Sequence, residues 1–283
     1  MAQEWQVGGK HFLITGGASG LGAAYVEAFL KLGAKNVAIL DINEKRGKEF
    51  AAKLSETYES KAIFIKCDVS NEEEIKNSFE QVLTAFKRID VIINNAGVMD
   101  DSIDVWRLSC DINWQGLVSF TRKGIEHMRK DKDGSGGTII NISSTAALTR
   151  VDILPTYCGS KAAVLHFSRS LSSQEFYDNT GVRILTLCLG PTATPLLDNI
   201  EPKTIDQKFS KSFLAYTTAY PYSNQSIESA VTAFVKMFRE GNPGSVWLAA
   251  RDRTGQDITS VLDEAENVVK NIVFPSDVPA YAK

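Results

Sequence analysis

The chain alternates between short apolar runs rich in β-branched residues and longer segments with helical periodicity. The apolar runs are HFLIT, NVAILD, AIFIKCD, DVIINNAG, TIINIS, VRILTLCL and SVWLAA. Strands that are apolar on both faces and separated by helices form parallel sheets with helices covering each side. The pattern therefore predicts an α/β fold: a single, doubly wound domain over residues 1–283, with a seven-stranded, mostly parallel sheet and helices on both faces.

The charge and the cysteine content narrow the possible partners and location. The 31 Lys and Arg nearly balance the 34 Asp and Glu, which gives no electrostatic reason to expect nucleic acid or an anionic membrane as a partner. The four cysteines are scattered and form no CxxC pair, and the three histidines form no ligand pair, so we expect neither disulfides nor a metal. The first residues lack the features of a signal peptide, and no apolar run is long enough to span a membrane. We expect a cytoplasmic protein.

Two segments lack a clear pattern. Residues 191–225 form a long irregular stretch, and such stretches in compact domains are often functional. We interpret this one as a substrate lid, and its apolar side chains favour an apolar ligand, although they could also pack on a small alcohol: Leu196, Leu197, Phe209, Phe213 and Tyr216. Residues 272–283 contain two prolines and are expected to form an irregular C-terminal tail.

A glycine-rich turn follows the first predicted strand. The stretch FLITGGASGLG places Gly16, Gly20 and Gly22 in a TGxxxGxG pattern where a strand leads into a helix. Backbone N–H groups and the positive end of a helix dipole meet there and favour a phosphate, which side chains would hold away. The spacing differs from GxGxxG, and a plain tight turn is the alternative. In an alternating α/β chain, the turn predicts a Rossmann-type dinucleotide site.

The second predicted strand ends in an acid, Asp41. A carboxylate at this place can accept hydrogen bonds from the ribose hydroxyls of NAD and would repel the 2′-phosphate of NADP. The sequence therefore favours NAD as the cofactor. Arg46, five residues further on, could soften this discrimination if it folds back, but we expect it to be a solvated residue on a helix face.

The stretch YCGSK places Tyr157 and Lys161 one helical turn apart on one face. An ammonium group beside a phenol favours the phenolate, which would make the tyrosine usable as a general base. Ser144 ends a predicted buried strand at the edge where such sheets bind ligands. Asn113 begins a helix, and a polar amide there, seen alone, is more often a structural group than a catalyst. The Tyr-x-x-x-Lys pair alone arises by chance, so it gains weight only with these neighbours.

Taken together, these motifs resemble the short-chain dehydrogenase/reductase family over residues 10–250. TGGASGLG is similar to its cofactor turn, and NNAG at residues 94–97 to its fourth-strand motif. Asn113, Ser144, Tyr157 and Lys161 match its catalytic tetrad in order and spacing. The resemblance implies that the tyrosine takes the alcohol proton and the serine steadies the substrate oxygen. It also implies that the lysine lowers the tyrosine pKa and holds the nicotinamide ribose, while the asparagine positions a water.

The resemblance also implies the cofactor contacts. Asp68 and Val69 would meet the adenine, and Thr194 the nicotinamide amide. One departure from the family pattern is Leu189, which stands where a proline is usual, before Gly190. The full set of expected cofactor contacts is Gly16, Ser19, Gly20, Leu21, Gly22, Asp41, Ile42, Asp68, Val69, Asn95, Ala96, Gly97, Tyr157, Lys161, Gly190, Thr192 and Thr194.

Within the family, the chain most resembles the branch that holds the insect alcohol dehydrogenases and 15-hydroxyprostaglandin dehydrogenase. That resemblance implies NAD-linked oxidation of a secondary or allylic alcohol. It also implies a homodimer formed through the two long helices around Asn113 and Tyr157, where Val164, Phe167 and Leu171 could form the interface or belong to the core. The alternatives are an NADPH-dependent carbonyl reductase, which Asp41 opposes, and a non-catalytic dinucleotide-binding regulator, which the complete tetrad opposes.

Overall fold

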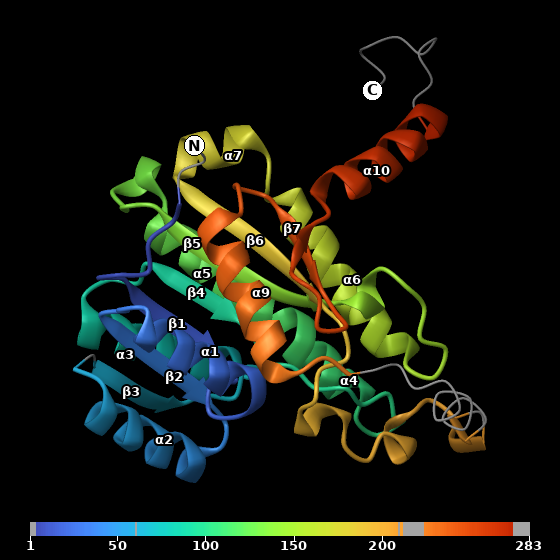
Figure 1. The fold of residues 1–283 in the computed structure, drawn as a ribbon, viewed down its shortest axis with the longest axis horizontal. Coiled ribbons are helices and arrows are strands. Elements are labelled where there is room, and N and C mark those ends of the chain that lie inside the picture. The colour runs from blue at the N-terminus through green and yellow to red at the C-terminus, as the bar shows by residue number, and fades with distance from the viewer. Residues whose placement is uncertain (1–3, 60, 209, 212–223, 274–283) are drawn as a thin grey trace.

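A computed structural model of the protein describes residues 4–59, 61–208, 210–211 and 224–273 (Figure 1). One sheet runs through the molecule in the order β3-β2-β1-β4-β5-β6-β7-β8. All neighbours pair in parallel except β7 and β8. The strands are β1 (His11–Thr15), β2 (Asn36–Asp41), β3 (Lys61–Lys66), β4 (Val91–Asn94), β5 (Gly137–Ser144), β6 (Val182–Leu189), β7 (Val246–Ala249) and β8 (Gln256–Asp257).

The seven predicted strands are confirmed, and β8 is an eighth strand that the sequence analysis missed. It has only two residues, both exposed, so it carries neither an apolar run nor an alternation. Seven parallel strands lie as predicted, with the strand order reversing direction between β1 and β4. Ligands of doubly wound sheets bind at the carboxyl ends of the strands at such a reversal point.

Helices cover both faces of the sheet (Figure 1). Alternate residues of the central strands point to opposite faces, so Phe12 and Ile14 belong to one apolar cluster and Leu13 to the other. The helices are α1 (Gly20–Lys31), α2 (Glu44–Thr57), α3 (Glu72–Phe86), α4 (Trp106–Cys110), α5 (Leu117–Met128), α6 (Pro155–Ser170), α7 (Gln174–Thr180), α9 (Ile227–Glu240) and α10 (Thr259–Val273). A π-helical turn at Asp111–Gly116 joins α4 to α5.

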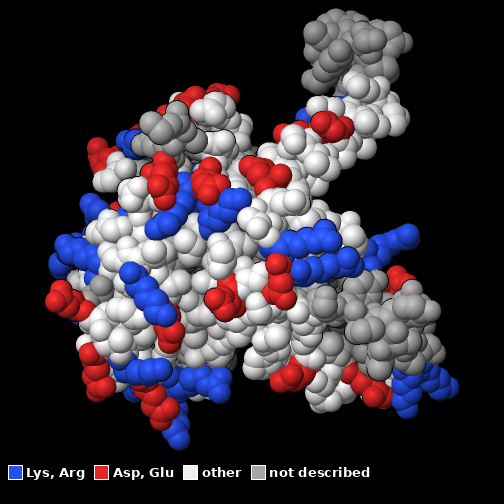
Figure 2. Space-filling model, in the orientation of Figure 1, with Lys and Arg blue, Asp and Glu red and all other residues white. Residues whose placement is uncertain are grey.

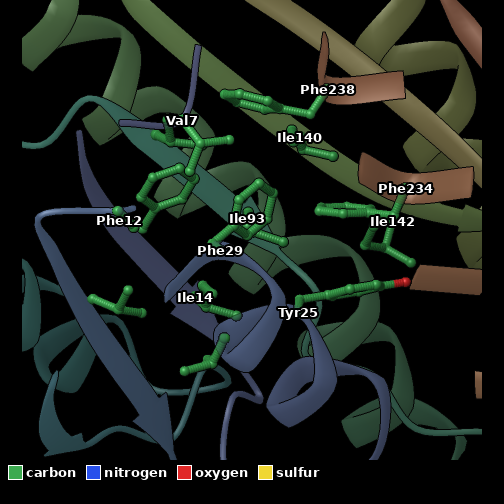
Figure 3. Packing of buried hydrophobic residues seen from close by; sticks show 14 of the residues in the cluster. Val7, Phe12, Ile14, Tyr25, Phe29, Ile93, Ile140, Ile142, Phe234 and Phe238 are labelled. Carbon is green, nitrogen blue, oxygen red and sulfur yellow. The ribbon is translucent and has the colours of Figure 1, made fainter. Parts of the chain in front are cut away.

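Aromatic rings fill the core between β1, α1 and α9 (Figure 3). Phe12 stacks on Phe29 with the ring centroids 4.5 Å apart, and Tyr25 stacks on Phe234 at 4.0 Å. Each ring is fully buried, and burying a side chain of this size stabilises a fold by roughly 1.5–3 kcal/mol. This packing holds α1 against β1 and α9, and the glycine turn is the segment that joins β1 to α1.

The predicted lid is described in part. Short 3₁₀ turns cover Pro195–Leu197 and Glu201–Lys203, and a bridge between Thr192 and Gln225 joins the two ends of the segment. Leu196 and Leu197 lie in the first of these turns. The other named lid residues, Phe209, Phe213 and Tyr216, lie outside the described residues.

The C-terminal prediction is wrong at its first residues. Ile272 and Val273 end the helix α10, which projects from the body of the molecule (Figure 1). The helix continues to Val273 because apolar residues recur every three or four positions from Val261 onward, and both prolines lie beyond its end. The remaining tail residues, 274–283, lie outside the described part of the chain.

Of the three candidate interface residues, Val164 is buried within the chain's own fold and Leu171 packs against a core cluster. Phe167 is partly exposed and meets Trp114 edge-on, with ring centroids 5.4 Å apart.

Acidic and basic side chains are interspersed on the face drawn in Figure 2. Among the described helices, none has the length and apolar character needed to cross a membrane.

Candidate active site

A cavity of about 570 Å³ opens at the carboxyl ends of the central strands, where the strand order reverses. Most of the predicted site residues line it, although they come from distant parts of the sequence. The predicted residues on its wall are Gly16, Ser19, Gly20, Leu21, Gly22, Asp41, Ile42, Asp68, Val69, Asn95, Ala96, Gly97, Tyr157, Lys161 and Thr194.

The glycine turn brings the start of α1 to the cavity. Ser19 is the N-cap of α1 and makes no side-chain hydrogen bond to the helix, whereas Asn43 and Asn71 cap the starts of α2 and α3 with their side chains. The first N–H groups of α1 are therefore not satisfied by their own N-cap. Gly20 has φ +52, and a Cβ there would meet nothing nearer than Thr194 at 3.9 Å. Open space beside uncapped N–H groups suits an anion.

The other glycines of the turn allow close packing. A Cβ on Gly22 would lie 2.0 Å from the carbonyl oxygen of Gly16, and a Cβ on Gly16 would lie 2.9 Å from Cα of Ala96. Asn95 fastens the turn to β4, because its Nδ2 donates to the carbonyl oxygens of Thr15 at 3.0 Å and Gly16 at 3.1 Å. The NNAG motif thus holds the turn in place as well as lining the cavity.

Asp41, the last residue of β2, lines the cavity, and its carboxylate is held by two backbone groups. Oδ2 accepts a hydrogen bond from the N–H of Ala18 at 3.0 Å, and Oδ1 accepts one from the N–H of Asn43 at 3.0 Å. Arg46 is exposed as expected, but it also lines the cavity beside Asp41. The expectation that Arg46 would be only a solvated residue is therefore incomplete.

Tyr157 and Lys161 line the same cavity from α6, where they lie one turn apart. This helix contacts β5, which β1 and β4 separate from the strand that carries Asp41. Both are nearly fully buried, with 8% and 5% of their surface exposed. The Lys161 Nζ lies 5.9 Å from the centroid of the Tyr157 ring and donates to the carbonyl oxygen of Ile142 at 3.1 Å. The predicted pairing on one face of a helix is confirmed.

The electrostatics of this pair differ from the expectation. Burial raises the pKa of Tyr157 above its usual range, and a side-chain hydrogen bond with Ser144 opposes that rise. Burial lowers the pKa of Lys161 to about 8. In the protein alone, desolvation outweighs any lowering of the phenol pKa by the ammonium group, because neither charge is solvated by water.

Two consecutive serines end β5 and point to different partners. Ser144 donates from Oγ to the carbonyl oxygen of Leu189 at 3.2 Å and accepts from the N–H of Ala146 at 3.1 Å. Its bond with Tyr157 places it beside the phenol, although it is not on the cavity wall. Ser143 does line the cavity, and its Oγ donates to the carbonyl oxygen of Lys161 at 2.9 Å.

Asn113 is fully buried in the π-helical turn and does not line the cavity. Its Oδ1 accepts from the N–H of Val98 at 2.8 Å, and its Nδ2 donates to the carbonyl oxygen of Val98 at 2.9 Å and to Oγ of Ser160 at 3.2 Å. A Cβ on Gly97 would lie 3.1 Å from Asn113 Oδ1 and 3.5 Å from Lys161 Nζ, so this glycine leaves space between the two groups.

Two expected cofactor residues after β6 are turned away from the cavity. Thr192 is buried, donates from Oγ1 to the carbonyl oxygen of Gly190 at 3.0 Å and accepts from Nε2 of Gln225 at 3.0 Å. A Cβ on Gly190 would lie 2.7 Å from Cβ of Ala250, so the glycine serves packing. Leu189, which replaces the usual proline, lines the cavity instead.

The sequence analysis missed the apolar wall beside Tyr157. Most of this wall comes from the loop after β4, from α4 and from the π-helical turn, where no periodic pattern marked it. Leu196 was expected as part of the lid. Two charged residues, Asp100 and Lys203, also lie on this wall. The apolar members are Val98, Met99, Val105, Leu108, Ile112, Pro195 and Leu196.

Comparison with known proteins finds a family match and relatives over about two thirds of this chain. The short chain dehydrogenase family model matches residues 10–205. The 15-hydroxyprostaglandin dehydrogenase [NAD(+)] of Rattus norvegicus is 40% identical over 196 residues, which cover 69% of this chain and 73% of the relative. Alcohol dehydrogenase 2 of Ceratitis rosa is 36% identical over 198 residues, covering 69% and 74%.

The fold is also found in solved structures. The NADPH-dependent 3-quinuclidinone reductase from Rhodotorula rubra matches with a TM-score of 0.72 and 24% identity, over 87% of this chain and 91% of that chain. Because the identity is low, this match bears on the fold alone. The family match and the two relatives show that the chain belongs to the short-chain dehydrogenase family.

Proposed function

We propose that the protein is an NAD-dependent oxidoreductase that transfers a hydride between a secondary or allylic, apolar alcohol and the nicotinamide, with Tyr157 as general base. The observation that carries the proposal is a single cavity lined by Asp41, by the glycine turn, and by Tyr157 with Lys161. The relatives from Rattus norvegicus and Ceratitis rosa, a 15-hydroxyprostaglandin dehydrogenase [NAD(+)] and an alcohol dehydrogenase, support the proposal.

The residues on the cavity wall fit a dinucleotide. The uncapped start of α1 and the open space at Gly20 suit a pyrophosphate. The fixed carboxylate of Asp41 suits the adenosine ribose hydroxyls and would repel a 2′-phosphate. We assign Asp68 and Val69 to the adenine side and Thr194 to the nicotinamide side, and we place Gly190 and Thr192 behind the wall as supports.

In the proposed oxidation, the alcohol loses its hydroxyl proton to Oη of Tyr157 and a hydride from its carbon. When bound, the oxidised nicotinamide accepts that hydride, and its positive charge favours the phenolate form of the tyrosine. Ser144 steadies the substrate oxygen beside the phenol, since its Oγ already forms a hydrogen bond with Tyr157. Lys161 holds the ribose, and its Nζ also donates a hydrogen bond to the carbonyl oxygen of Ile142. The reverse transfers reduce a carbonyl.

Asn113 keeps in this proposal the indirect role that the resemblance implies, and it also supports the cavity wall. Its three hydrogen bonds join the loop after β4 to α6, so it holds the wall behind Lys161. The space that Gly97 leaves between Asn113 Oδ1 and Lys161 Nζ is where a bridging group would lie. We therefore assign Asn113 to positioning the proton path rather than to contact with the substrate.

The apolar wall beside Tyr157 supports an apolar substrate. Leu108 and Leu196 are exposed yet line the cavity, which leaves apolar surface open to a ligand. We propose that residues 191–225 act as the substrate lid, anchored at their ends by the bridge between Thr192 and Gln225.

We also propose that the protein forms a homodimer and that it is located in the cytoplasm. Trp114 and Phe167 lie on the two helical segments that flank the site and present partly exposed rings to a partner. All four cysteines are free, which suits a reducing compartment. Sedimentation of the protein and of a Phe167→Ser variant tests the interface; an unchanged dimer in the variant would contradict this placement.

The second candidate is an NADPH-dependent carbonyl reductase, and Arg46 on the cavity wall beside Asp41 is the observation that favours it. Dissociation constants for NAD⁺ and NADP⁺ decide between the two cofactors. Tighter binding of NADP⁺ would overturn the assignment to NAD. The activity itself is tested by a screen of alcohols and carbonyls that follows the absorbance of reduced nicotinamide. No turnover of any compound with either cofactor would support a non-catalytic regulator.

A further inference from the structure

Asp101, a buried acid in the loop after β4, is bonded to the helix that carries Tyr157. Only 3% of its surface is exposed. Its Oδ2 accepts a hydrogen bond from the N–H of Thr156 at 2.5 Å, and its Oδ1 accepts one from the N–H of Tyr157 at 2.9 Å. Both oxygens of the carboxylate are thus used on two consecutive residues of α6, 55 and 56 positions away in the sequence.

The start of α6 has no cap of its own, which gives these two bonds their importance. Its N-cap residue, Leu154, has no side-chain acceptor, and the first helical residue is Pro155, which has no N–H. The first N–H groups that need a partner therefore belong to Thr156 and Tyr157. Asp101 satisfies both and places a negative charge at the positive end of the helix dipole.

The same residue ties in a third segment of the chain. The N–H of Asp101 donates to the carbonyl oxygen of Lys203 at 2.8 Å. Two residues further on, the N–H of Ile205 donates to the carbonyl oxygen of Ile153, just before α6, at 3.1 Å. Lys203 also lines the cavity. The start of α6 is thereby linked both to the loop after β4 and to the segment that follows β6.

We propose that Asp101 is a positioning residue: it sets the position of Tyr157 at the cavity by holding the first turn of α6 against the loop after β4 and the segment at Lys203. This inference rests on the proposed function of Tyr157. Asp101 does not line the cavity, so it acts through the tyrosine rather than on substrate or cofactor. The phenol must stay beside Ser144, and small displacements of a reacting group cost up to about 100-fold in rate.

The test is an Asp101→Asn variant, which keeps the size of the side chain but turns an amide NH₂ towards one of the two N–H donors. We expect kcat for alcohol oxidation to fall by roughly 10- to 100-fold. We expect the dissociation constant for NAD⁺ to change by less than about twofold, because the glycine turn and Asp41 lie at other strand ends. The hydrogen bond with Ser144 lowers the pKa of Tyr157 in the wild type. Asp101→Asn should weaken this bond, so the pKa of Tyr157 should rise and the pH profile of kcat/KM should move to higher pH.

The matched control is Ser173→Ala, which removes another side-chain cap, the bond from the N–H of Phe176 to Oγ of Ser173 at the start of α7. Ser173→Ala should lower the thermal midpoint of unfolding, because a helix loses its cap. It should leave kcat and the pH profile of kcat/KM unchanged. If Asp101→Asn behaves like this control, Asp101 is only a structural cap and the proposal is wrong.

A second variant guards against a failure to fold. Asp101→Glu keeps the charge but lengthens the side chain, so it should fold, lose kcat and shift the pH profile; wild-type values in this variant would also overturn the proposal. The two hypotheses fail separately. An active Tyr157→Phe variant would contradict the proposed function. An inactive Tyr157→Phe variant together with a fully active Asp101→Asn variant would contradict only the inference about Asp101.

Discussion

Lys161 donates a hydrogen bond from Nζ to the backbone carbonyl oxygen of Ile142 at 3.1 Å, from a site where only 5% of its surface is exposed. Burial lowers the pKa of this amine to about 8. A lysine held in this way is expensive for the fold, because a buried ammonium group loses its hydration. Its presence beside Tyr157 is explained by the proposed chemistry rather than by stability.

Replacing this lysine should therefore stabilise the protein without cofactor. We expect Lys161→Met to raise the free energy of unfolding by about 1–3 kcal/mol at pH 7, since one pKa unit corresponds to about 1.4 kcal/mol and the bond to Ile142 is lost. The pKa of Lys161 is about 8 in the folded protein, against an unperturbed value of 10.5. Between these two pH values the unfolded wild-type chain therefore binds more protons than the folded one. Wild-type stability relative to the variant therefore rises with pH across that window.

Denaturant unfolding of both proteins at several pH values measures this difference. The difference in the free energy of unfolding between Lys161→Met and the wild type should become smaller between pH 8 and 10.5. The variant should also have lost its turnover. A variant that is less stable than the wild type at every pH would contradict the view that Lys161 is retained at a cost to stability.

Asp41 should decide between the two cofactors. We expect Asp41→Ala to weaken NAD⁺ binding by roughly 10-fold, the loss of about one charged hydrogen bond, and to strengthen NADP⁺ binding because the repulsion of the 2′-phosphate is removed. Arg46→Ala is the matched variant on the same wall, and it should leave NAD⁺ binding unchanged while weakening NADP⁺ binding. Titration of each protein with both cofactors checks this, and equal preference in all three proteins would contradict the assignment.

The wall beside Tyr157 should set the preference for substrate size. Leu108 is 46% exposed and lines the cavity. Leu108→Asp should therefore raise KM for a long-chain secondary alcohol by roughly 10-fold, since about 1.4 kcal/mol of apolar contact is lost. KM for isopropanol should stay the same. Steady-state kinetics with the two alcohols measures the ratio, and an equal change for both would place the apolar substrate elsewhere.

The direction of the reaction should depend on pH through Tyr157. Burial raises the pKa of this phenol above its usual range, so the phenolate form needed for oxidation grows as the pH rises. We expect kcat/KM for alcohol oxidation to increase with pH and kcat/KM for carbonyl reduction to decrease. Rate profiles in both directions check this, and an oxidation rate that falls as the pH rises from 7 to 9 would contradict a tyrosine base.

Much of the site could be predicted because its signals are local. The Gly16–Gly22 turn, Asp41 and the Tyr157–Lys161 pair each lie within one turn or at the end of one apolar run, so spacing alone indicates their geometry. The parallel sheet then requires that the strand ends meet. The cavity lined by these residues follows directly from that arrangement.

The parts that could not be predicted depend on contacts between distant segments. Nothing in the sequence around Asn113 indicates that its amide is occupied by the backbone of Val98, or that Thr192 turns to Gln225. Asp101 lies in a loop with no periodic pattern, and its bonds to α6 appear only in the fold. The raised pKa of Tyr157 likewise follows from burial, which the spacing of Tyr157 and Lys161 does not reveal.

The most direct test of the central claim is turnover and cofactor binding in Tyr157→Phe. This change removes only the phenol oxygen, and the ring keeps its packing beside Met99, Ala146 and Leu154. We predict that kcat for alcohol oxidation falls by about 1,000-fold or more, within the range for loss of a general base, while the dissociation constant for NAD⁺ stays within about twofold of the wild-type value. A variant that binds NAD⁺ and oxidises the alcohol at the wild-type rate would contradict the account.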